Sequence, residues 1–437
     1  MQKVGQKSRI KIMDGFLVKG FSGKRILEGV LPVMGAKNFA LKAQAASLLF
    51  GGHVLLENMP LIDDVCKMNQ MLEDLGVKIE RVKKRNFELN IPAVIKTDLD
   101  KNTAKSLRSS IVLVGPILAR EGKVSFPHPG GCVIGQRPID VFLEAFKKMG
   151  ARVRLNKDLY TLEADKLKGA EIFFRMPSVT ATETLMMSAV LAKGKTVLYN
   201  CACEPEIMFL AEFLNSAGAR INGAGTHTIV VQGGGLLKGD SICRVPPDRI
   251  EAGSFAIIAA LCAKKLKITN CVPAHMRAVL QALQNVGVKI NFGKNYLLIK
   301  ESPGLKPSDI KTREYPGFPT DLQALFSVLL TQASGRSFVF ETVFEGRLNY
   351  LFDLERMGAD VVVCDPHRAI INGPTKLRGR KMESPDLRAG LAFIIAGMVA
   401  EGESFVDNAN NIDRGYENIE GRLNAVGAEI KRITNNE

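Results

Sequence analysis

Residues 71–80 read MLEDLGVKIE, a segment in which an amphipathic helix stops at Gly76 and a short strand follows. The pattern recurs as AFKKMGARVR (145–154), FLNSAGARIN (213–222), LQNVGVKIN (283–291), LERMGADVV (354–362) and RLNAVGAEI (422–430). The six glycines are Gly76, Gly150, Gly218, Gly287, Gly358 and Gly427, separated by 74, 68, 69, 71 and 69 residues. Glycine after a helix accepts the positive φ that reverses the chain. The regular spacing predicts six copies of one unit of about 70 residues.

A second pattern precedes each copy: a helix breaks at a turn and continues as a strand, first in LLFGGHVLLEN (48–58). Five of the six turns contain glycine, and the fourth has Lys264-Lys265 instead. In the first unit we predict helices at 40–50 and 63–75 and strands at 54–57, 77–82 and 87–90. With a leading strand, each unit becomes βαβαββ. Such a unit cannot bury both helices alone, so we predict two α/β domains of three units each.

The composition is that of an ordinary globular protein: 46% of the 437 residues are hydrophobic and 24% are charged. This excludes collagen-like, disordered and coiled-coil proteins. No apolar run reaches about 18 residues, so no membrane span is predicted, and the basic N-terminus lacks the apolar core of a secretory signal. The eight cysteines include no CxxC pair, and Cys201-Ala-Cys203 has no second pair to complete a zinc site. We therefore expect a cytoplasmic protein with reduced thiols and no metal.

The net charge of +14 (59 Lys and Arg against 45 Asp and Glu) indicates an anionic partner. Nucleic-acid binders cluster their basic residues among aromatic ones. Here the charge is spread, tryptophan is absent and only six tyrosines are present, so we favour a cleft for small anionic substrates over a nucleic-acid site. No GxGxxG or GxxxxGK[ST] motif occurs, so no nucleotide cofactor is predicted. The sequence does not indicate an oligomeric state.

Two glycine-containing segments combine reactive or charged side chains with irregular backbone. Residues 129–138 read PGGCVIGQRP and place the Cys132 thiol near the Arg137 guanidinium, which favours a reactive cysteine over an incidental one in a glycine-rich turn. Residues 35–38 read GAKN, which places Lys37 at the start of a helix. A cation there opposes the helix dipole unless an anion is bound, although a solvated surface lysine is an equal alternative.

The remaining candidates are an aspartate and four arginines. In GFPTDLQ (317–323) we expect Thr320 to cap the next helix, which leaves Asp321 free for acid–base chemistry. Arginines occur at repeat-equivalent places beside glycine or proline in otherwise apolar segments. Bidentate guanidinium groups there are typical of phosphate or carboxylate recognition. They are Arg108, Arg347, Arg388 and Arg414.

These motifs, in this order, resemble the UDP-N-acetylglucosamine enolpyruvyl transferase family from about residue 14 to 432. The segments on which this resemblance rests are GAKN, LRSS, PGGCVIGQRP, FPTD, TVFEGR, DLRAG and DRGYE. The cysteine loop is specific, because the related 5-enolpyruvylshikimate-3-phosphate synthases lack it. The resemblance implies an inside-out α/β barrel of two domains, residues 36–246 and residues 1–35 with 247–437. The chain then crosses between domains near 30–37 and at RVPPDR (244–249), with the active site in the cleft.

The implied reaction joins phosphoenolpyruvate to the 3′-hydroxyl of UDP-N-acetylglucosamine and releases phosphate, the first committed step of peptidoglycan synthesis. The resemblance assigns Cys132 as proton donor and fosfomycin target, and Asp321 as the group at the sugar hydroxyl. It implies phosphoenolpyruvate contacts from Lys37, Asn38, Arg137, Arg347, Arg388 and Arg414. It implies nucleotide-sugar contacts from Arg108, Arg137, Pro138, Ile139, Asp140, Val141, Pro177, Ser178, Val179, Asp321 and Val343.

Two positions depart from the family pattern: Thr180 replaces a glycine at the uridine side, and Cys203 replaces an arginine before EPEI. Neither belongs to the acid, base or cationic set, so altered affinity is expected rather than lost activity. The alternatives are transfer to another acceptor such as shikimate 3-phosphate, a catalytically silent nucleotide-sugar-binding paralogue, and a basic nucleic-acid binder. No nucleic-acid or membrane partner is expected.

Overall fold

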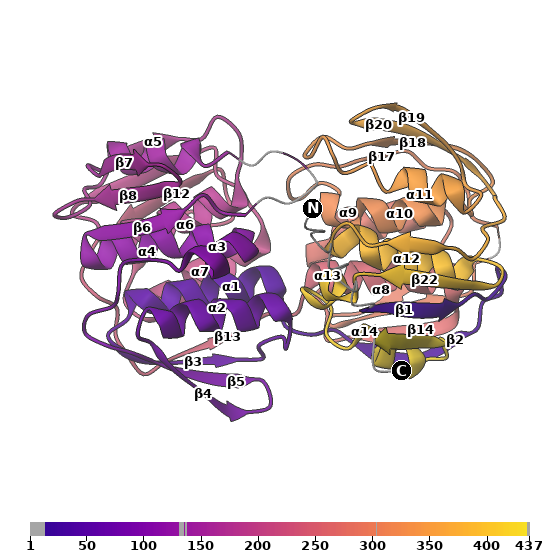
Figure 1. Ribbon diagram of the computed structural model, residues 1–437, viewed down its shortest axis with the longest axis horizontal. Helices are drawn as coiled ribbons and strands as arrows, with labels where there is room; N and C mark the ends of the chain where they lie inside the picture. The colour runs from indigo at the N-terminus through magenta and orange to yellow at the C-terminus, as the bar shows by residue number, and fades with distance from the viewer. Residues whose placement is uncertain (1–13, 131–134, 136–137, 303, 435–437) are drawn as a thin grey trace, which may run out of the picture.

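The computed structural model describes residues 14–130, 135, 138–302 and 304–434. Two lobes of mixed helices and strands lie side by side, with helices at the centre of each lobe and sheets around them (Figure 1). The described strands form five sheets of four strands and one of three. Six sheets match the six units predicted from the glycine spacing.

Every four-stranded sheet has the same strand order. The leading strand pairs parallel with the second strand, the second pairs antiparallel with the fourth, and the fourth pairs antiparallel with the third. In the first unit these are β13 (Ser241–Arg244), β3 (Gly52–Glu57), β5 (Asn86–Ile91) and β4 (Lys78–Lys83). Helices α1 (Lys37–Ala46), continued by η1 (Ser47–Leu49), and α2 (Asp63–Asp74) connect them. The βαβαββ prediction is confirmed, with the first helix beginning three residues earlier than predicted.

The second and third units complete the first lobe. The second contains α3 (Lys101–Ser106), η2 (Arg108–Ser110), α4 (Ile111–Glu121), β6 (Lys123–Pro127), α5 (Asp140–Lys148), β7 (Arg152–Asn156) and β8 (Leu159–Glu163). Its leading strand is reduced to one bridge between Asp98 and Ser125. The third contains β9 (Glu171–Phe173), α6 (Val179–Val190), β10 (Lys195–Tyr199), α7 (Pro205–Ser216), β11 (Arg220–Asn222) and β12 (Thr228–Gln232).

The last three units form the second lobe. The fourth contains α8 (Arg249–Cys262), β14 (Ala263–Thr269), η3 (Pro273–Met276), α9 (Arg277–Asn285), β15 (Lys289–Phe292) and β16 (Tyr296–Lys300). The fifth contains β17 (Ile310–Lys311), η4 (Thr320–Leu322), α10 (Gln323–Leu330), β18 (Gly335–Phe340), α11 (Leu351–Arg356), β19 (Asp360–Asp365) and β20 (Arg368–Gly373). The sixth contains β21 (Lys381–Glu383), α12 (Leu387–Val399), β22 (Glu403–Asp407), α13 (Ala409–Asp413), α14 (Ile419–Asn424) and β23 (Ile430–Thr434).

Three strands lie in sheets of units that are distant in sequence. The N-terminal strand β1 (Asp14–Lys19) lies between β22 and β23 as the fourth strand of the sixth unit. The next strand, β2 (Leu27–Pro32), leads the fourth unit by pairing with β14. Strand β13 follows the third unit but leads the first. The chain therefore passes between lobes after β2 and again after β13.

The six glycines of the repeat all adopt positive φ, between 90° and 105°. Each one follows the second helix of its unit, as the sequence predicted. The turn after the first helix also contains a positive-φ glycine in five units. In the fourth unit, where the sequence has Lys264-Lys265, α8 passes directly into β14 without such a turn.

Asparagines join the second strand to the leading strand in four units. Asn58, Asn200, Asn270 and Asn408 follow β3, β10, β14 and β22, and all have positive φ. Each side-chain amide donates to the carbonyl just after the leading strand, for example from Asn270 to Val33 at 2.6 Å and from Asn200 to Phe174 at 2.8 Å. Asparagine tolerates this backbone conformation and its side chain supplies the hydrogen-bond donor. The same structural requirement therefore explains the asparagine in each of the four units.

Each lobe has its own hydrophobic core. One core runs from Ala36 to Val245, and the other combines residues 16–33 with residues 250–430. Helices α4, α8 and α12 are buried almost throughout, because they lie inside the ring of sheets. Among the described residues, no helix is both long and apolar enough to cross a membrane.

Candidate active site

The central helices bring most of the predicted side chains to their N-terminal ends. Lys37 is the first residue of α1, Arg108 opens the turn before α4, and Ser178 caps α6. In the second lobe, Asp321 lies in the turn before α10 and Arg388 lies in the first turn of α12. Helix N-termini carry unpaired N–H groups and partial positive charge, so this arrangement favours anions.

Lys37 lies in a buried ion-pair cluster that joins the lobes. Its Nζ is 2.7 Å from Asp64 Oδ2, and Arg414 Nε from the second lobe donates to Asp64 Oδ1 at 2.9 Å. The Asp64 side chain is 2% exposed. Burial works to raise the pKa of Asp64, but Lys37 and Arg414 outweigh it and hold that pKa below its ordinary value. Lys37 is therefore not the solvated surface lysine of the alternative interpretation, and the anion beside it is the carboxylate of α2.

Asp321 lies between two arginines rather than free in the cleft. Arg347 Nη1 donates to Asp321 Oδ1 and Arg388 Nη2 donates to Asp321 Oδ2, both at 3.0 Å. The arginine side chains are 6% and 7% exposed, and Asp321 is 27% exposed. Burial acts to raise the pKa of Asp321, but Arg388 and Arg347 together hold it far below its ordinary value. The expectation of a free carboxylate is wrong for this state of the protein, because the cations predicted for the substrate pair with it.

Two polar groups hold these arginines in place. Arg388 Nη1 donates to the Tyr416 hydroxyl at 2.8 Å. The same hydroxyl shares a second hydrogen bond, also 2.8 Å long, with the Ser254 hydroxyl. Arg347 Nη1 donates to the Thr320 hydroxyl at 2.9 Å, and that hydroxyl donates to buried Glu341 at 2.8 Å. The prediction that Thr320 caps the following helix is wrong, since its side chain makes no cap bond and positions the guanidinium instead.

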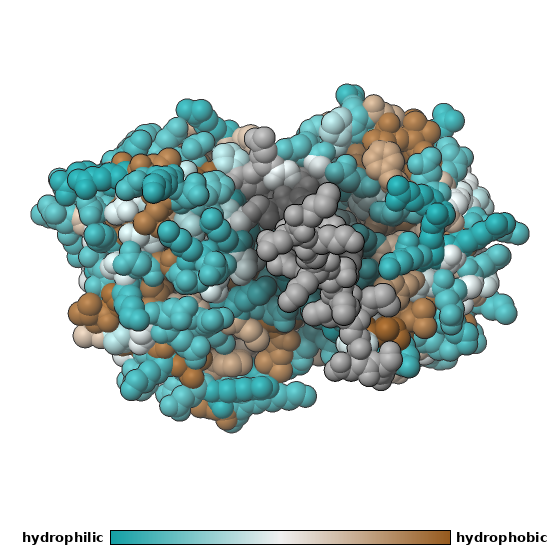
Figure 2. Space-filling view, viewed as in Figure 1, coloured by the Kyte–Doolittle hydropathy of each residue, from teal (hydrophilic) through white to brown (hydrophobic). Residues whose placement is uncertain are grey.

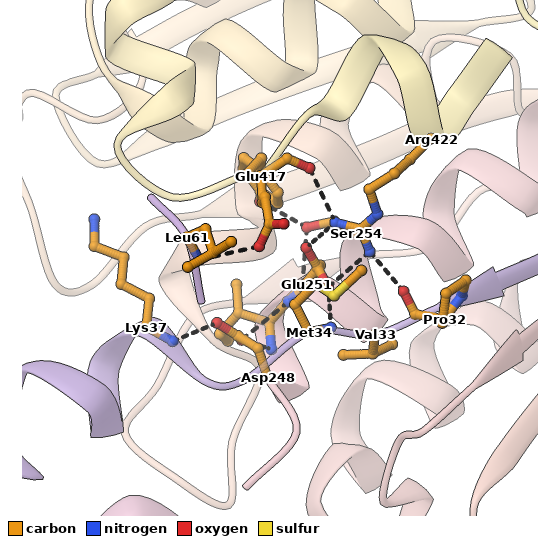
Figure 3. A network of polar contacts seen from close by, with 12 residues as sticks. Pro32, Val33, Met34, Lys37, Leu61, Asp248, Glu251, Ser254, Glu417 and Arg422 are labelled. Carbon is orange, nitrogen blue, oxygen red and sulfur yellow. Dashed lines mark hydrogen bonds and ion pairs between the residues drawn. The ribbon is translucent and has the colours of Figure 1, made fainter. Parts of the chain in front are cut away.

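The two crossings meet beside this cluster at the start of α8 (Figure 3). Asp248 caps α8 and also accepts the backbone N–H of Lys37 at 3.1 Å. Buried Glu251 accepts from Met34 N and from Arg422, whose other nitrogen donates to the Pro32 carbonyl. One carboxylate of α8 thereby fixes the N-terminal crossing to α14.

A second carboxylate connects the lobes directly. Glu417 accepts two bonds from Arg85, at 2.6 and 2.7 Å, and one from Leu61 N at 3.0 Å. Both Arg85 and Leu61 belong to the first unit, whereas Glu417 precedes α14. Bidentate guanidinium pairing fixes both distance and direction, so the lobes are held in one relative orientation here.

Among the described residues, the predicted nucleotide-sugar residues lie in the first lobe, apart from Asp321 and Val343. Arg108 Nη1 donates to the Pro129 carbonyl at 3.2 Å, which connects the α4 end to the cysteine segment. Ser178 is engaged as the cap of α6, Pro177 and Val179 are half-buried, and Ile139 is buried. Asn38 and Val141 are half-buried, while Pro138, Asp140 and Val343 are exposed. Cys132 and Arg137 lie outside the described residues.

The cysteine segment approaches the second lobe at Gly135. A Cβ added there would lie 2.6 Å from a carboxylate oxygen of Glu345, so the backbone of Gly135 and this side chain are in close contact. Glu345 follows Val343 by two residues. The two lobes therefore approach each other at Gly135 and Glu345.

The sequence interpretation missed Asp64, Tyr416 and Glu341. Asp64 looks like an ordinary acidic residue in the first turn of a helix. Tyr416 is the buried acceptor of Arg388, and Glu341 is the buried acceptor of the Thr320 hydroxyl. The four arginines also form two positional classes rather than one. Arg108 and Arg388 lie at central helices, whereas Arg347 precedes α11 and Arg414 follows α13.

The two departures from the family pattern lie in ordinary environments. Thr180 is half-buried in α6, and Cys203 Sγ is 3.5 Å from His227 Nδ1. Burial raises the pKa of Cys203, and the neighbouring Glu204 adds to this. Across the described ranges, no three His, Cys, Asp or Glu side chains are grouped so as to hold a metal ion.

Residues 22–423 match the model of a protein family described as EPSP synthase (3-phosphoshikimate 1-carboxyvinyltransferase). The UDP-N-acetylglucosamine 1-carboxyvinyltransferase of Halothermothrix orenii is 43% identical over 426 residues, which cover 96% of this chain and all of the relative. The protein of that name from Koribacter versatilis is 42% identical, covering 96% of this chain and 97% of the relative. The chain belongs to the UDP-N-acetylglucosamine 1-carboxyvinyltransferase family.

Solved structures show the same fold as this family member. The enolpyruvyl transferase NikO from Streptomyces tendae superposes with a TM-score of 0.87 at 22% identity, covering 97% of this chain and 99% of that one. An EPSP synthase from Acinetobacter baumannii gives a TM-score of 0.73 at 20% identity, covering 96% and 100%. The predicted two-domain fold of six units is confirmed.

Proposed function

We propose that this protein transfers the enolpyruvyl group of phosphoenolpyruvate to the 3′-hydroxyl of UDP-N-acetylglucosamine and releases phosphate. This is the first committed step of peptidoglycan synthesis, carried out in the cytoplasm. The names of the relatives support the two substrates. The observation that carries the proposal is a group of four cations, three buried and one half-buried, around two carboxylates. Buried Lys37 and half-buried Arg414 share Asp64, and buried Arg347 and Arg388 share Asp321.

The cations divide into two sets that suit the two ends of phosphoenolpyruvate. We assign its phosphate to Lys37, Asn38, Arg137 and Arg414, and its carboxylate to Arg347 and Arg388. Guanidinium groups bind carboxylates through two parallel N–H donors, and both arginines present donors to a carboxylate already. Asp321 thus occupies the charge position that the substrate carboxylate would take.

The reaction proceeds by addition and elimination. The acceptor oxygen bonds to C2 of phosphoenolpyruvate while its proton passes to Asp321, and Cys132 donates a proton to C3. The C2–O bond to phosphate then breaks and C3 returns a proton to the Cys132 thiolate, which restores the double bond, while the proton on Asp321 leaves with the released phosphate. A carboxylate and a thiol are suitable proton carriers for these steps.

Pairing with two arginines lowers the basicity of Asp321. While both guanidinium groups face it, its pKa is far below the ordinary value, which makes it a weak base. Binding of the substrate carboxylate draws these cations away, and the pKa of Asp321 rises. The base would then become active only when phosphoenolpyruvate is present.

The nucleotide sugar is assigned to the first lobe and the facing edge of the second. We propose contacts from Arg108, Arg137, the segment 138–141, residues 177–179, Asp321 and Val343. The domains we propose are residues 36–246 and residues 1–35 with 247–437. Closure of one domain on the other would exclude water from the reaction.

An acceptor screen tests this function. Phosphate release from phosphoenolpyruvate is measured with UDP-N-acetylglucosamine, with shikimate 3-phosphate and without acceptor. Release that depends on the nucleotide sugar supports the proposal, and release that depends on shikimate 3-phosphate identifies the other acceptor. Nucleotide-sugar binding by calorimetry without turnover would identify a silent paralogue and overturn the proposal.

A further inference from the structure

One face of the fourth unit carries a row of like charges across its sheet. Lys300, at the end of β16, lies opposite Lys265 of β14 on one side and opposite Lys289 of β15 on the other. All three side chains are exposed. Adjacent strands are about 4.8 Å apart, so the row spans about 10 Å. Like charges directly opposite each other destabilise a sheet, which calls for a reason to keep them.

The other five units serve as internal controls. In each of them the strand register identifies the three residues that correspond to Lys265, Lys300 and Lys289. In the second unit the central Glu163 lies between Lys123 and Arg152. In the sixth, the central Lys19 lies opposite Glu403 and pairs with Glu429 at 2.8 Å. The first, third and fifth units have an uncharged Asn90, Gln232 or Asn372 in the centre. Within the described residues, three like charges in this row occur in the fourth unit alone.

Further residues on the same face add charge and apolar surface. Lys267 lies two residues beyond Lys265, and its Nζ is 4.8 Å from the centre of the Tyr296 ring. On the edge strand β2, the exposed Glu28 lies opposite Lys265, so the row of lysines ends at one acidic residue, and Val30, 55% exposed, lies opposite Lys267. Leu298, half-buried, lies opposite Lys267 on the other side. We call Lys265, Lys267, Lys289 and Lys300 the lysine face.

The lysine face is remote from the candidate active site. Its row lies where α8 has just ended at Cys262, whereas the first residue of α8, Arg249, lies at the crossing between lobes. A helix of 14 residues is about 21 Å long. The row therefore cannot contact a substrate bound between the lobes.

We propose that the lysine face binds an anionic membrane surface by reversible, peripheral contact. A lipid leaflet offers many headgroup charges in one plane, which matches a row of cations on a sheet. The exposed Val30 and the half-buried Leu298 favour lipid over nucleic acid, and the Tyr296 ring is covered by Lys267 rather than open for base stacking. From the sequence we expect no membrane partner, whereas the strand register indicates one.

Vesicle sedimentation tests the proposal with the full-length protein. Vesicles of phosphatidylcholine alone or mixed with phosphatidylglycerol are compared at low and high salt. The triple variant Lys265→Gln, Lys289→Gln, Lys300→Gln is compared with Lys78→Gln, Lys148→Gln, Lys193→Gln, which removes the same charge from exposed sites of the first lobe. Each lysine near an anionic leaflet contributes about fivefold, so the first variant should bind roughly a hundredfold more weakly than wild type.

The outcomes separate the lysine face from net charge. Salt-sensitive binding to the anionic vesicles that the first variant loses and the second keeps supports the proposal. Equal loss in both variants, or no binding by the wild type, overturns it. Retention on DNA that depends on the same lysines, without vesicle binding, would assign the face to nucleic acid and also overturn it.

A single substitution gives a second readout that does not depend on lipid. Lys300→Glu places an anion between Lys265 and Lys289, as in the second unit. It should raise the melting temperature at low salt and, because it changes the charge by two, weaken vesicle binding by roughly 25-fold, while phosphate release stays unchanged. A variant that gains no stability, or that binds vesicles as tightly as the wild type, contradicts the role of the charge row.

Discussion

Replacing Asp321 by asparagine should change catalysis and substrate binding in opposite directions. The carboxylate lies 3.0 Å from one nitrogen of each of Arg347 and Arg388. At an effective dielectric of about 20, each such pair is worth about 5 kcal/mol before desolvation is subtracted. In Asp321→Asn, phosphoenolpyruvate no longer competes for these arginines. Even about 1.4 kcal/mol of the recovered attraction tightens its binding tenfold.

The same variant should lose most of its turnover. A general base contributes about a hundredfold to ten-thousandfold, so kcat should fall by that factor. The folded state also loses the partner of two buried charges, which costs about 3–5 kcal/mol and lowers the melting temperature. Calorimetry gives the Kd of phosphoenolpyruvate with the nucleotide sugar present, and phosphate release gives kcat.

Asp353→Asn is the matched control. Asp353 is 28% exposed, close to the 27% of Asp321, and it accepts from Arg356 at 3.0 Å, but Arg356 is a single exposed partner outside the candidate site. We expect unchanged kcat and Kd in this control. Weaker phosphoenolpyruvate binding in Asp321→Asn, or full turnover, would refute the argument that this carboxylate is both base and substrate mimic.

Four further predictions concern other parts of the molecule. Asp64→Asn leaves Lys37 and Arg414 without their shared carboxylate, so the free energy of unfolding should fall by about 3–5 kcal/mol, as measured by denaturation. Inorganic phosphate should inhibit this variant more strongly, as measured by its inhibition constant. Burial raises the pKa of Glu183 to about 7, against the opposing effect of Lys42. The protonated side chain therefore stabilises the folded state at low pH, and this stability is lost as the pH rises from about 4.5 to about 7. Across this range the melting temperature should fall less in Glu183→Gln than in the wild type. Asn270→Ala loses a 2.6 Å hydrogen bond and strains a positive-φ position, so it should be less stable than Asn270→Gly, which loses only the bond; equal urea midpoints would contradict this. Fosfomycin should form one covalent adduct on Cys132, detected by mass spectrometry and absent in Cys132→Ser.

The repeat was predictable from sequence because its signals are local. The glycine after each second helix is required by a positive φ, so its spacing gives the unit length directly. The strand order is not local. Nothing in residues 14–19 indicates that β1 completes the sixth unit, since that pairing is decided by a sheet edge formed some 400 residues later.

The sequence indicated several charged side chains that the structure places in buried ion pairs, but it did not indicate their partners. Glycine and proline beside arginine indicated an anion site, and Lys37, Arg347 and Arg388 do lie in buried ion pairs. That Asp64 and Asp321 neutralise them depends on three-dimensional proximity between segments up to 350 residues apart. Sequence spacing carries no information on such contacts.

The most direct test uses the purified protein with phosphoenolpyruvate and UDP-N-acetylglucosamine. Mass spectrometry identifies the product, and phosphate release is measured in the same reaction. We expect one phosphate for each nucleotide sugar that gains an enolpyruvyl ether. Phosphate released without a modified nucleotide sugar, or no phosphate at all, would contradict it.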